Sequence, residues 1–125
     1  MSDGVKILLI EDDVCISEAT SMFLEIAGYE IVPAFSCHEA VEKISAHNFD
    51  VIISDMFLPD GDCFSIMNKL LEKGDPVKKI LVSGGTDRIS ANDAVNMGEA
   101  FFDASLLKPV KAVELKKTIE NVLAA

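Results

Sequence analysis

The chain has 125 residues, of which 21 are Asp or Glu and 11 are Lys or Arg, so its formal net charge is −10. Half of the residues are apolar, which excludes a disordered chain, and the length suits one domain over residues 1–125. The acidic balance argues against partners such as nucleic acids and anionic membranes, because both are bound through clustered basic side chains.

Apolar runs do not exceed four residues, far fewer than the ~20 that a membrane-spanning helix needs. The N-terminal segment lacks the pattern of a secretory signal peptide. Three cysteines without CxxC spacing are typical of ordinary thiols in a reducing compartment. We therefore expect a cytoplasmic protein.

The first half of the chain alternates apolar runs with helical periodicity. Val5–Ile10 is a nearly continuous apolar run, which predicts a strand buried on both faces. Val14–Ala27 has apolar residues at helical spacing and is predicted to be a helix. Glu30–Ala34 is predicted to be a weaker strand, and the capping box Ser36–Glu39 opens a second helix.

The second half continues this alternation. The predicted strands are Asp50–Ser54, Lys78–Ser83 and Ala104–Leu107. The predicted helices are Cys63–Lys73, Asp87–Met97 and Lys111–Leu123, and Leu58–Asp62 is predicted to be a turn. Strands that alternate with helices indicate an α/β fold with a parallel sheet and right-handed crossovers.

Ligands of open α/β sheets bind outside the carboxyl ends of the strands. The ionisable or hydroxyl-bearing residues at these ends are Glu11, Asp12, Asp13, Asp55, Ser83 and Lys108. Clustered carboxylates repel one another unless a cation neutralises them, and Mg²⁺ prefers oxygen ligands. A lysine and a serine beside such an ion would complete a site for phosphoryl transfer, with Asp55 as the nucleophile.

Each of these segments by itself also has an ordinary structural explanation. The acidic run Glu11–Asp13 suits the N-terminus of a helix, and Asp55 stands before a turn. Ser83 precedes two glycines, and Lys108 lies at a strand-to-helix junction. Their joint placement at four strand ends is what favours a functional site.

Four ordered motifs, ILLIEDD, DMFLPDGD, LVSGG and LLKP, resemble the receiver domain of two-component response regulators over nearly the whole chain. The resemblance implies a flavodoxin-like fold: a doubly wound, five-stranded parallel sheet of order 2-1-3-4-5 with five helices on both faces. It also implies a phosphoacceptor aspartate at Asp55. The implied Mg²⁺ ligands are Asp12, Asp55 and the Phe57 carbonyl, with Glu11 binding through water.

The same resemblance assigns the remaining site residues. Ser83 and Lys108 would contact the phosphoryl group, and the Lys108–Pro109 peptide would be cis. The sequence departs from the usual pattern at Ser105, where most receivers have an aromatic residue that moves on activation. Phe101 and Phe102 lie in an unusually long segment before it, either as core residues or as an exposed pair that marks a partner site.

The function implied by the resemblance is that of a stand-alone receiver. It would accept a phosphoryl group from a histidine kinase or a histidine phosphotransfer protein and signal to a downstream protein target through the fourth helix and fifth strand. It would promote its own phosphorylation and dephosphorylation without being an enzyme in the usual sense.

Three alternatives of other classes remain. A Mg²⁺-dependent phosphohydrolase of the haloacid-dehalogenase type would carry D-x-D at a strand end, and the segment Asp55-Met56-Phe57 lacks the second Asp. A flavin-binding protein would need Ser, Thr or Gly amides where the first loop has acids. The third alternative is a non-catalytic interaction domain.

Overall fold

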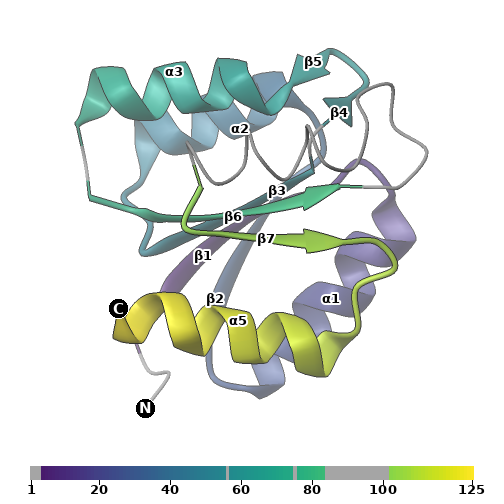
Figure 1. Ribbon diagram of the computed structural model, residues 1–125. Helices are drawn as coiled ribbons and strands as arrows, with labels where there is room; N and C mark the ends of the chain where they lie inside the picture. The colour runs from purple at the N-terminus through teal and green to yellow at the C-terminus, as the bar shows by residue number, and fades with distance from the viewer. Residues whose placement is uncertain (1–3, 56, 75, 84–101) are drawn as a thin grey trace.

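The computed structural model describes residues 4–55, 57–74, 76–83 and 102–125 (Figure 1). Its main sheet has five parallel strands in the order β2-β1-β3-β6-β7. Their bounds are Glu30–Ala34, Lys6–Ile10, Val51–Asp55, Lys78–Ser83 and Ala104–Leu107. Numbered along the chain without the short strands β4 and β5, this is the predicted order 2-1-3-4-5.

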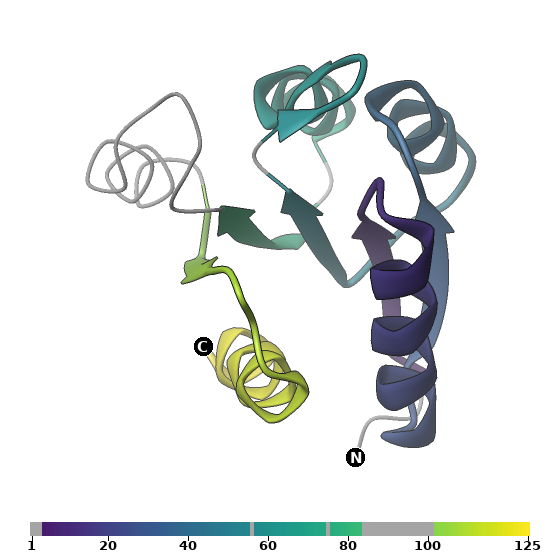
Figure 2. The ribbon, with the colours of Figure 1, turned by 90° about the vertical axis from the view of Figure 1, so that its right-hand side faces the viewer.

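The described helices cover both faces of the sheet (Figures 1 and 2). Helices α2 (Cys37–Ala46) and α3 (Cys63–Lys73) lie over one face, and α1 (Val14–Ile26) and α5 (Ala112–Ala124) lie over the other. The sheet is therefore doubly wound, as predicted. The fifth expected helix, Asp87–Met97, falls outside the described residues.

Each face of the sheet has its own hydrophobic core. Ile10, Ile52 and Leu81 point toward α2 and α3, where Ile44 and Ile66 pack against them. The alternate strand positions, among them Ile7, Leu9, Ile53 and Ile80, point to the other face. There they pack against Leu24 of α1 and against Leu115 and Ile119 of α5. This division explains why the strands read as continuous apolar runs, since both sides of each central strand are buried.

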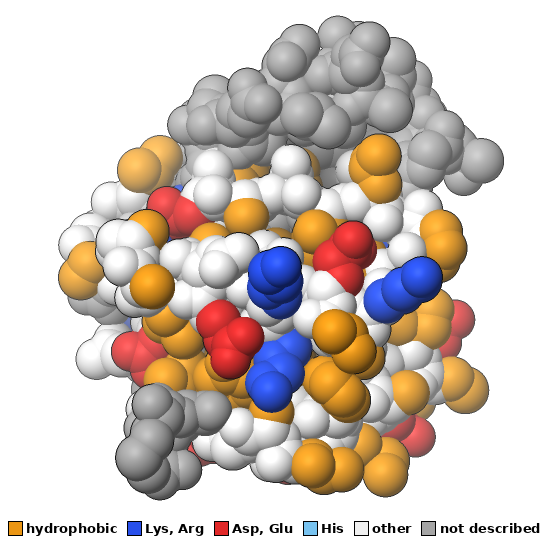
Figure 3. Space-filling view, turned by 60° about the horizontal axis from the view of Figure 1, so that its bottom comes forward, with side chains coloured by type: hydrophobic (Ala, Val, Ile, Leu, Met, Phe, Trp, Pro, Cys, Tyr) orange, Lys and Arg blue, Asp and Glu red, His pale blue; other side chains and the backbone are white. Residues whose placement is uncertain are grey.

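Helix α1 presents a different face to the core from the one that its apolar residues suggest. Its buried residues are Ser17 and Leu24, whereas Met22 is 63% exposed and Ile26 is 84% exposed. The apolar spacing of α5 predicts that Leu115, Ile119, Val122 and Leu123 face the core. The first three are buried, but Leu123 is 36% exposed. Figure 3 views the molecule from this side, where charged and apolar side chains lie interspersed on the surface.

Part of the acidic charge lies on the outer surfaces of the helices. Five acidic side chains of the helices are exposed and form part of a solvated acidic coat: Glu18, Glu25, Glu42, Glu72 and Glu120. Among the described residues, none of the helices combines the length and apolar character needed to cross a bilayer.

A short antiparallel hairpin occupies the predicted turn Leu58–Asp62. Strand β4 (Phe57–Leu58) pairs with β5 (Gly61–Asp62), so that Pro59 and Asp60 form the connection. This hairpin directly follows Asp55, the last residue of β3, one residue beyond the predicted end of that strand. The chain thus turns back at the carboxyl edge of the sheet, next to the predicted site.

Phe102 belongs to the core. Its side chain is 8% exposed and lies in the cluster on the α2–α3 side of the sheet, together with Leu58 and Leu81. Of the two interpretations of the aromatic pair, the core interpretation therefore holds for Phe102. Phe101 lies outside the described residues.

Candidate functional site

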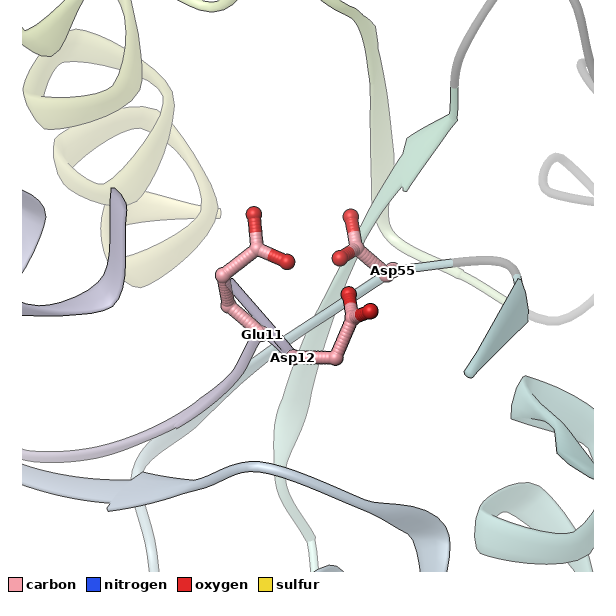
Figure 4. Close-up of side chains that lie close together, drawn as sticks. All are labelled: Glu11, Asp12 and Asp55. Carbon is pink, nitrogen blue, oxygen red and sulfur yellow. The ribbon is translucent and has the colours of Figure 1, made fainter. Parts of the chain in front are cut away.

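Three carboxylates meet at the carboxyl edge of the sheet (Figure 4). Glu11 and Asp12 follow β1, and Asp55 ends the adjacent strand β3. One oxygen from each of the three side chains lies within 4.8 Å of the others. Glu11 is 6% exposed and Asp55 is 5% exposed, whereas Asp12 is exposed. The parallel register therefore brings together acids that are more than 40 positions apart in the sequence.

Lys108 supplies the positive charge of this site. Its Nζ lies 2.8 Å from Oδ1 of Asp55 and 3.7 Å from Oε1 of Glu11. The residue follows β7, which is separated from β3 by β6 in the sheet, so the side chain reaches across one strand. The Lys108–Pro109 peptide bond is cis, as the resemblance implied.

The close approach of these groups shifts their proton affinities. Burial, together with the hydrogen bond and charge of Asp55, raises the pKa of Glu11 to about 7. Burial and the neighbouring Glu11 raise the pKa of Asp12. For Lys108, burial by itself would lower the pKa, but the carboxylates of Asp55, Glu11 and Asp12 raise it overall. All three shifts arise from negative charge crowded into a partly buried space.

The arrangement fits a hard divalent cation. When all are ionised, the three carboxylates and the Lys108 ammonium leave two negative charges, the amount that one Mg²⁺ ion balances. In addition, Oδ2 of Asp55 is buried and has no hydrogen-bond partner among the described residues. A buried carboxylate oxygen without a partner is costly, and a cation would relieve that cost.

The remaining predicted residues lie around this group. Ser83 is the last residue of β6, is 3% exposed, and its carbonyl accepts a hydrogen bond of 2.8 Å from the N–H of Lys108. Phe57 begins β4, two residues beyond Asp55. Asp13 serves the helix instead: its Oδ1 accepts a hydrogen bond from the N–H of Ile16, and it is the N-cap of α1.

One contact in this region, between Asp60 and the start of α2, was not predicted from the sequence. The carboxylate of Asp60, in the connection between β4 and β5, accepts hydrogen bonds from the backbone N–H groups of Cys37 and His38 at the start of α2. The LPDGD motif contains the residue, but its partners lie more than 20 positions away. No local pattern in the sequence could have paired them.

These features define a doubly wound α/β protein with an acidic, lysine-paired site at the carboxyl edge of its sheet. The model of the response regulator receiver domain family matches residues 7–120, and the chain belongs to this family.

Similar proteins include response regulators of several organisms. The chain is 32% identical over 121 residues to the transcriptional regulatory protein CrdR of Helicobacter pylori, covering 93% of the chain and 54% of that protein. It is 32% identical over 123 residues to the phosphoglycerate transport system transcriptional regulatory protein PgtA of Salmonella typhimurium, covering 98% of the chain and 29% of that protein. The chain thus spans about half or less of the length of these relatives.

Solved receiver structures have the same fold. A CheY-like response regulator receiver domain protein from Methanospirillum hungatei is 31% identical, with a TM-score of 0.82 over 96% of the chain and 94% of that structure. A response regulator receiver domain protein from Clostridium thermocellum is 27% identical, with a TM-score of 0.83 over 96% and 94%. The chain is therefore a receiver domain of the two-component signalling type, which confirms the prediction from the four motifs.

Proposed function

We propose that this receiver accepts a phosphoryl group on Asp55 from the phosphohistidine of a histidine kinase or a histidine phosphotransfer protein. The observation that carries the proposal is the environment of Asp55. One of its oxygens is held by Lys108 at 2.8 Å, the other is buried without a partner among the described residues, and two further acids lie beside it. A carboxylate in such a site is a suitable nucleophile toward phosphorus.

The transfer step follows from these positions. A carboxylate oxygen of Asp55 forms a bond to phosphorus while the phosphorus–nitrogen bond of the donor breaks, and the electron pair leaves with the imidazole. Lys108 keeps the Asp55 carboxylate oriented before the transfer. Its side chain is 40% exposed, so its ammonium group can pair with the phosphoryl oxygens afterwards. The Ser83 hydroxyl would donate a hydrogen bond to the same group.

A Mg²⁺ ion would be held by Asp12, by Asp55 and by the carbonyl of Phe57, with Glu11 binding through water. When bound, the ion supplies positive charge against the phosphoryl oxygens as the transition state develops. The proposed output is a signal to a partner protein, or to further domains of a longer chain, from the side of the sheet that carries β7. We propose that the protein acts in the cytoplasm and that it returns to its unphosphorylated state by promoting the loss of its own phosphoryl group.

Acetyl phosphate, a small phosphoryl donor, tests this function directly. Incubation with Mg²⁺ should add about 80 Da to the intact mass, the mass of one phosphoryl group. Asp55→Asn should abolish the addition. Asp50→Asn is the matched control, because Asp50 precedes the same strand at its opposite end and binds the N–H of Lys6.

The result also separates the alternatives. Steady release of phosphate from many phosphate esters, without a stable adduct, would favour a phosphohydrolase. Failure to form an adduct with acetyl phosphate and with a phosphohistidine donor would contradict the proposed function.

A further inference from the structure

The carboxylate of Asp60 ties the β4–β5 hairpin to the start of α2. Its Oδ1 accepts a hydrogen bond of 2.8 Å from the N–H of Cys37, and its Oδ2 accepts one of 3.0 Å from the N–H of His38. These two hydrogen bonds lower the pKa of Asp60, so the group is ionised at neutral pH. Hydrogen bonds to an ionised acceptor are stronger than those between neutral groups.

The cap of α2 is shared between two side chains. The hydroxyl of Ser36 accepts a hydrogen bond of 3.1 Å from the N–H of Glu39, and the carbonyl of Ser36 accepts the N–H of Ala40. The Asp60 carboxylate accepts the N–H groups of Cys37 and His38, which lie between Ser36 and Glu39 in the sequence. Loss of the Ser36 hydroxyl would therefore weaken the same helix end without touching the hairpin.

The hairpin depends on outside anchors. Its strands have two residues each, and a two-stranded ribbon of that size is not stable by itself. One anchor is Leu58, which is 8% exposed and packs in the core. The second anchor is the pair of hydrogen bonds that joins the Asp60 carboxylate to the start of α2. Phe57 lies between these anchors and Asp55, so its main chain is held from both sides.

We propose that Asp60 is a positioning residue for the Mg²⁺ site: its hold on α2 fixes the main chain of the hairpin and thereby the carbonyl group of Phe57. The inference rests on the proposed function, because it takes the ion to bind at Glu11, Asp12 and Asp55. Asp60 does not belong to the group of three acids that could hold the ion, and its two oxygens accept hydrogen bonds from the amides of Cys37 and His38. By thermodynamic reciprocity, a bound ion also strengthens the link between Asp60 and α2.

Two variants of the full chain separate positioning from capping. Asp60→Ala and Ser36→Ala each remove one part of the α2 cap, and the melting temperature without Mg²⁺ measures that shared loss. Isothermal titration with Mg²⁺ should show that Asp60→Ala weakens binding about tenfold, as loss of an orienting partner typically does. Ser36→Ala should leave the affinity unchanged, and Asp60→Asn, which keeps one acceptor oxygen, should fall between.

Equal Mg²⁺ affinities of Asp60→Ala and Ser36→Ala would overturn the inference, because Asp60 would then be a helix cap only. Hydrogen exchange on the unaltered chain gives a second measurement that needs no variant to fold. Saturating Mg²⁺ should slow exchange at the amides of Cys37 and His38, and unchanged exchange there would also overturn the inference. If the unaltered chain binds no Mg²⁺, the proposed function falls as well; if it binds Mg²⁺ and Asp60→Ala binds equally, only the positioning role falls.

Discussion

The ammonium nitrogen of Lys108 lies 2.8 Å from Oδ1 of Asp55, although Asp55 ends β3 and Lys108 follows β7, with β6 between the two strands. The lysine side chain is 40% exposed and the aspartate side chain is 6% exposed. The pair therefore serves mainly to stabilise a buried negative charge. It makes Lys108 the resident counter-ion of the acidic group when no metal is bound.

Replacement of Lys108 should destabilise the metal-free protein. Lys108→Met keeps most of the side-chain volume but leaves the Asp55 carboxylate without its counter-ion. The expected loss in free energy of unfolding at pH 7 is about 1 kcal/mol, less than for a fully buried pair because Lys108 is partly exposed. Urea unfolding measures it. Lys111→Met, at an exposed lysine nearby, is the control, and an equal loss in both variants would contradict a specific role of the pair.

The stability of the metal-free protein should fall as Glu11 ionises. Its pKa rises from the ordinary 4.5 to about 7 on folding, so the folded state holds the proton more tightly. The stabilising contribution of protonated Glu11 is thus fully present below about pH 4.5 and is lost as the pH rises through about 7, with a total on the order of 3 kcal/mol. Glu11→Gln, which cannot ionise, should lack this fall in urea titrations from pH 4.5 to 8. Parallel curves for the two proteins would argue against the raised pKa.

Asp12→Asn should raise the melting temperature without Mg²⁺, because it removes one of the charges that repel Glu11. The same change should reduce the stabilisation that Mg²⁺ gives the protein, since the proposed site loses one of its carboxylate ligands. Asp13→Asn is a closely matched control: it removes one negative charge at the next position, and asparagine caps a helix about as well as aspartate. A similar response of both variants would show that net charge alone, and not the cluster, determines the stability.

Phe102→Ala should destabilise the fold by about 3 kcal/mol, because it removes a buried aromatic side chain from the core on the α2–α3 side. The milder variant Phe102→Leu should still take up a phosphoryl group from acetyl phosphate at Asp55. Chemical denaturation and intact mass provide the two measurements. A stability that is unchanged in Phe102→Ala would return this residue to the exposed, partner-binding interpretation.

The main sheet could be predicted from the sequence because its central strands are buried on both faces and therefore read as largely apolar runs, while helical segments alternate with the strands along the chain. Strands Glu30–Ala34, Lys78–Ser83 and Ala104–Leu107 have their predicted bounds, and Val51–Asp55 is displaced by one residue. Parallel strands place their carboxyl ends at one edge, so the grouping of the acids with Lys108 followed from strand assignment alone.

Features that depend on tertiary contacts were harder to predict. The apolar spacing of α1 predicted a helix correctly but not its buried face, where Ser17 is covered and Ile26 is not. One of the two hydrogen bonds of the predicted capping box is present, because the Ser36 hydroxyl accepts the N–H of Glu39. The Glu39 carboxylate accepts the N–H of Phe35, where a capping box has the N–H of Ser36. In both cases the local sequence pattern predicts the helix. The buried face and the hydrogen-bond partners depend on the packing of the folded chain.

The hydrogen bond from the N–H of Lys108 to the carbonyl of Ser83 joins main-chain atoms of adjacent strand ends. Its length does not depend on which side chains these positions carry. The separation between the main-chain anchor points of the Ser83 hydroxyl and the Lys108 ammonium, the two groups proposed to contact a phosphoryl group, is therefore set by the sheet itself. Exchange of either side chain would therefore change the chemistry at this edge of the sheet and leave the spacing of the two anchor points the same.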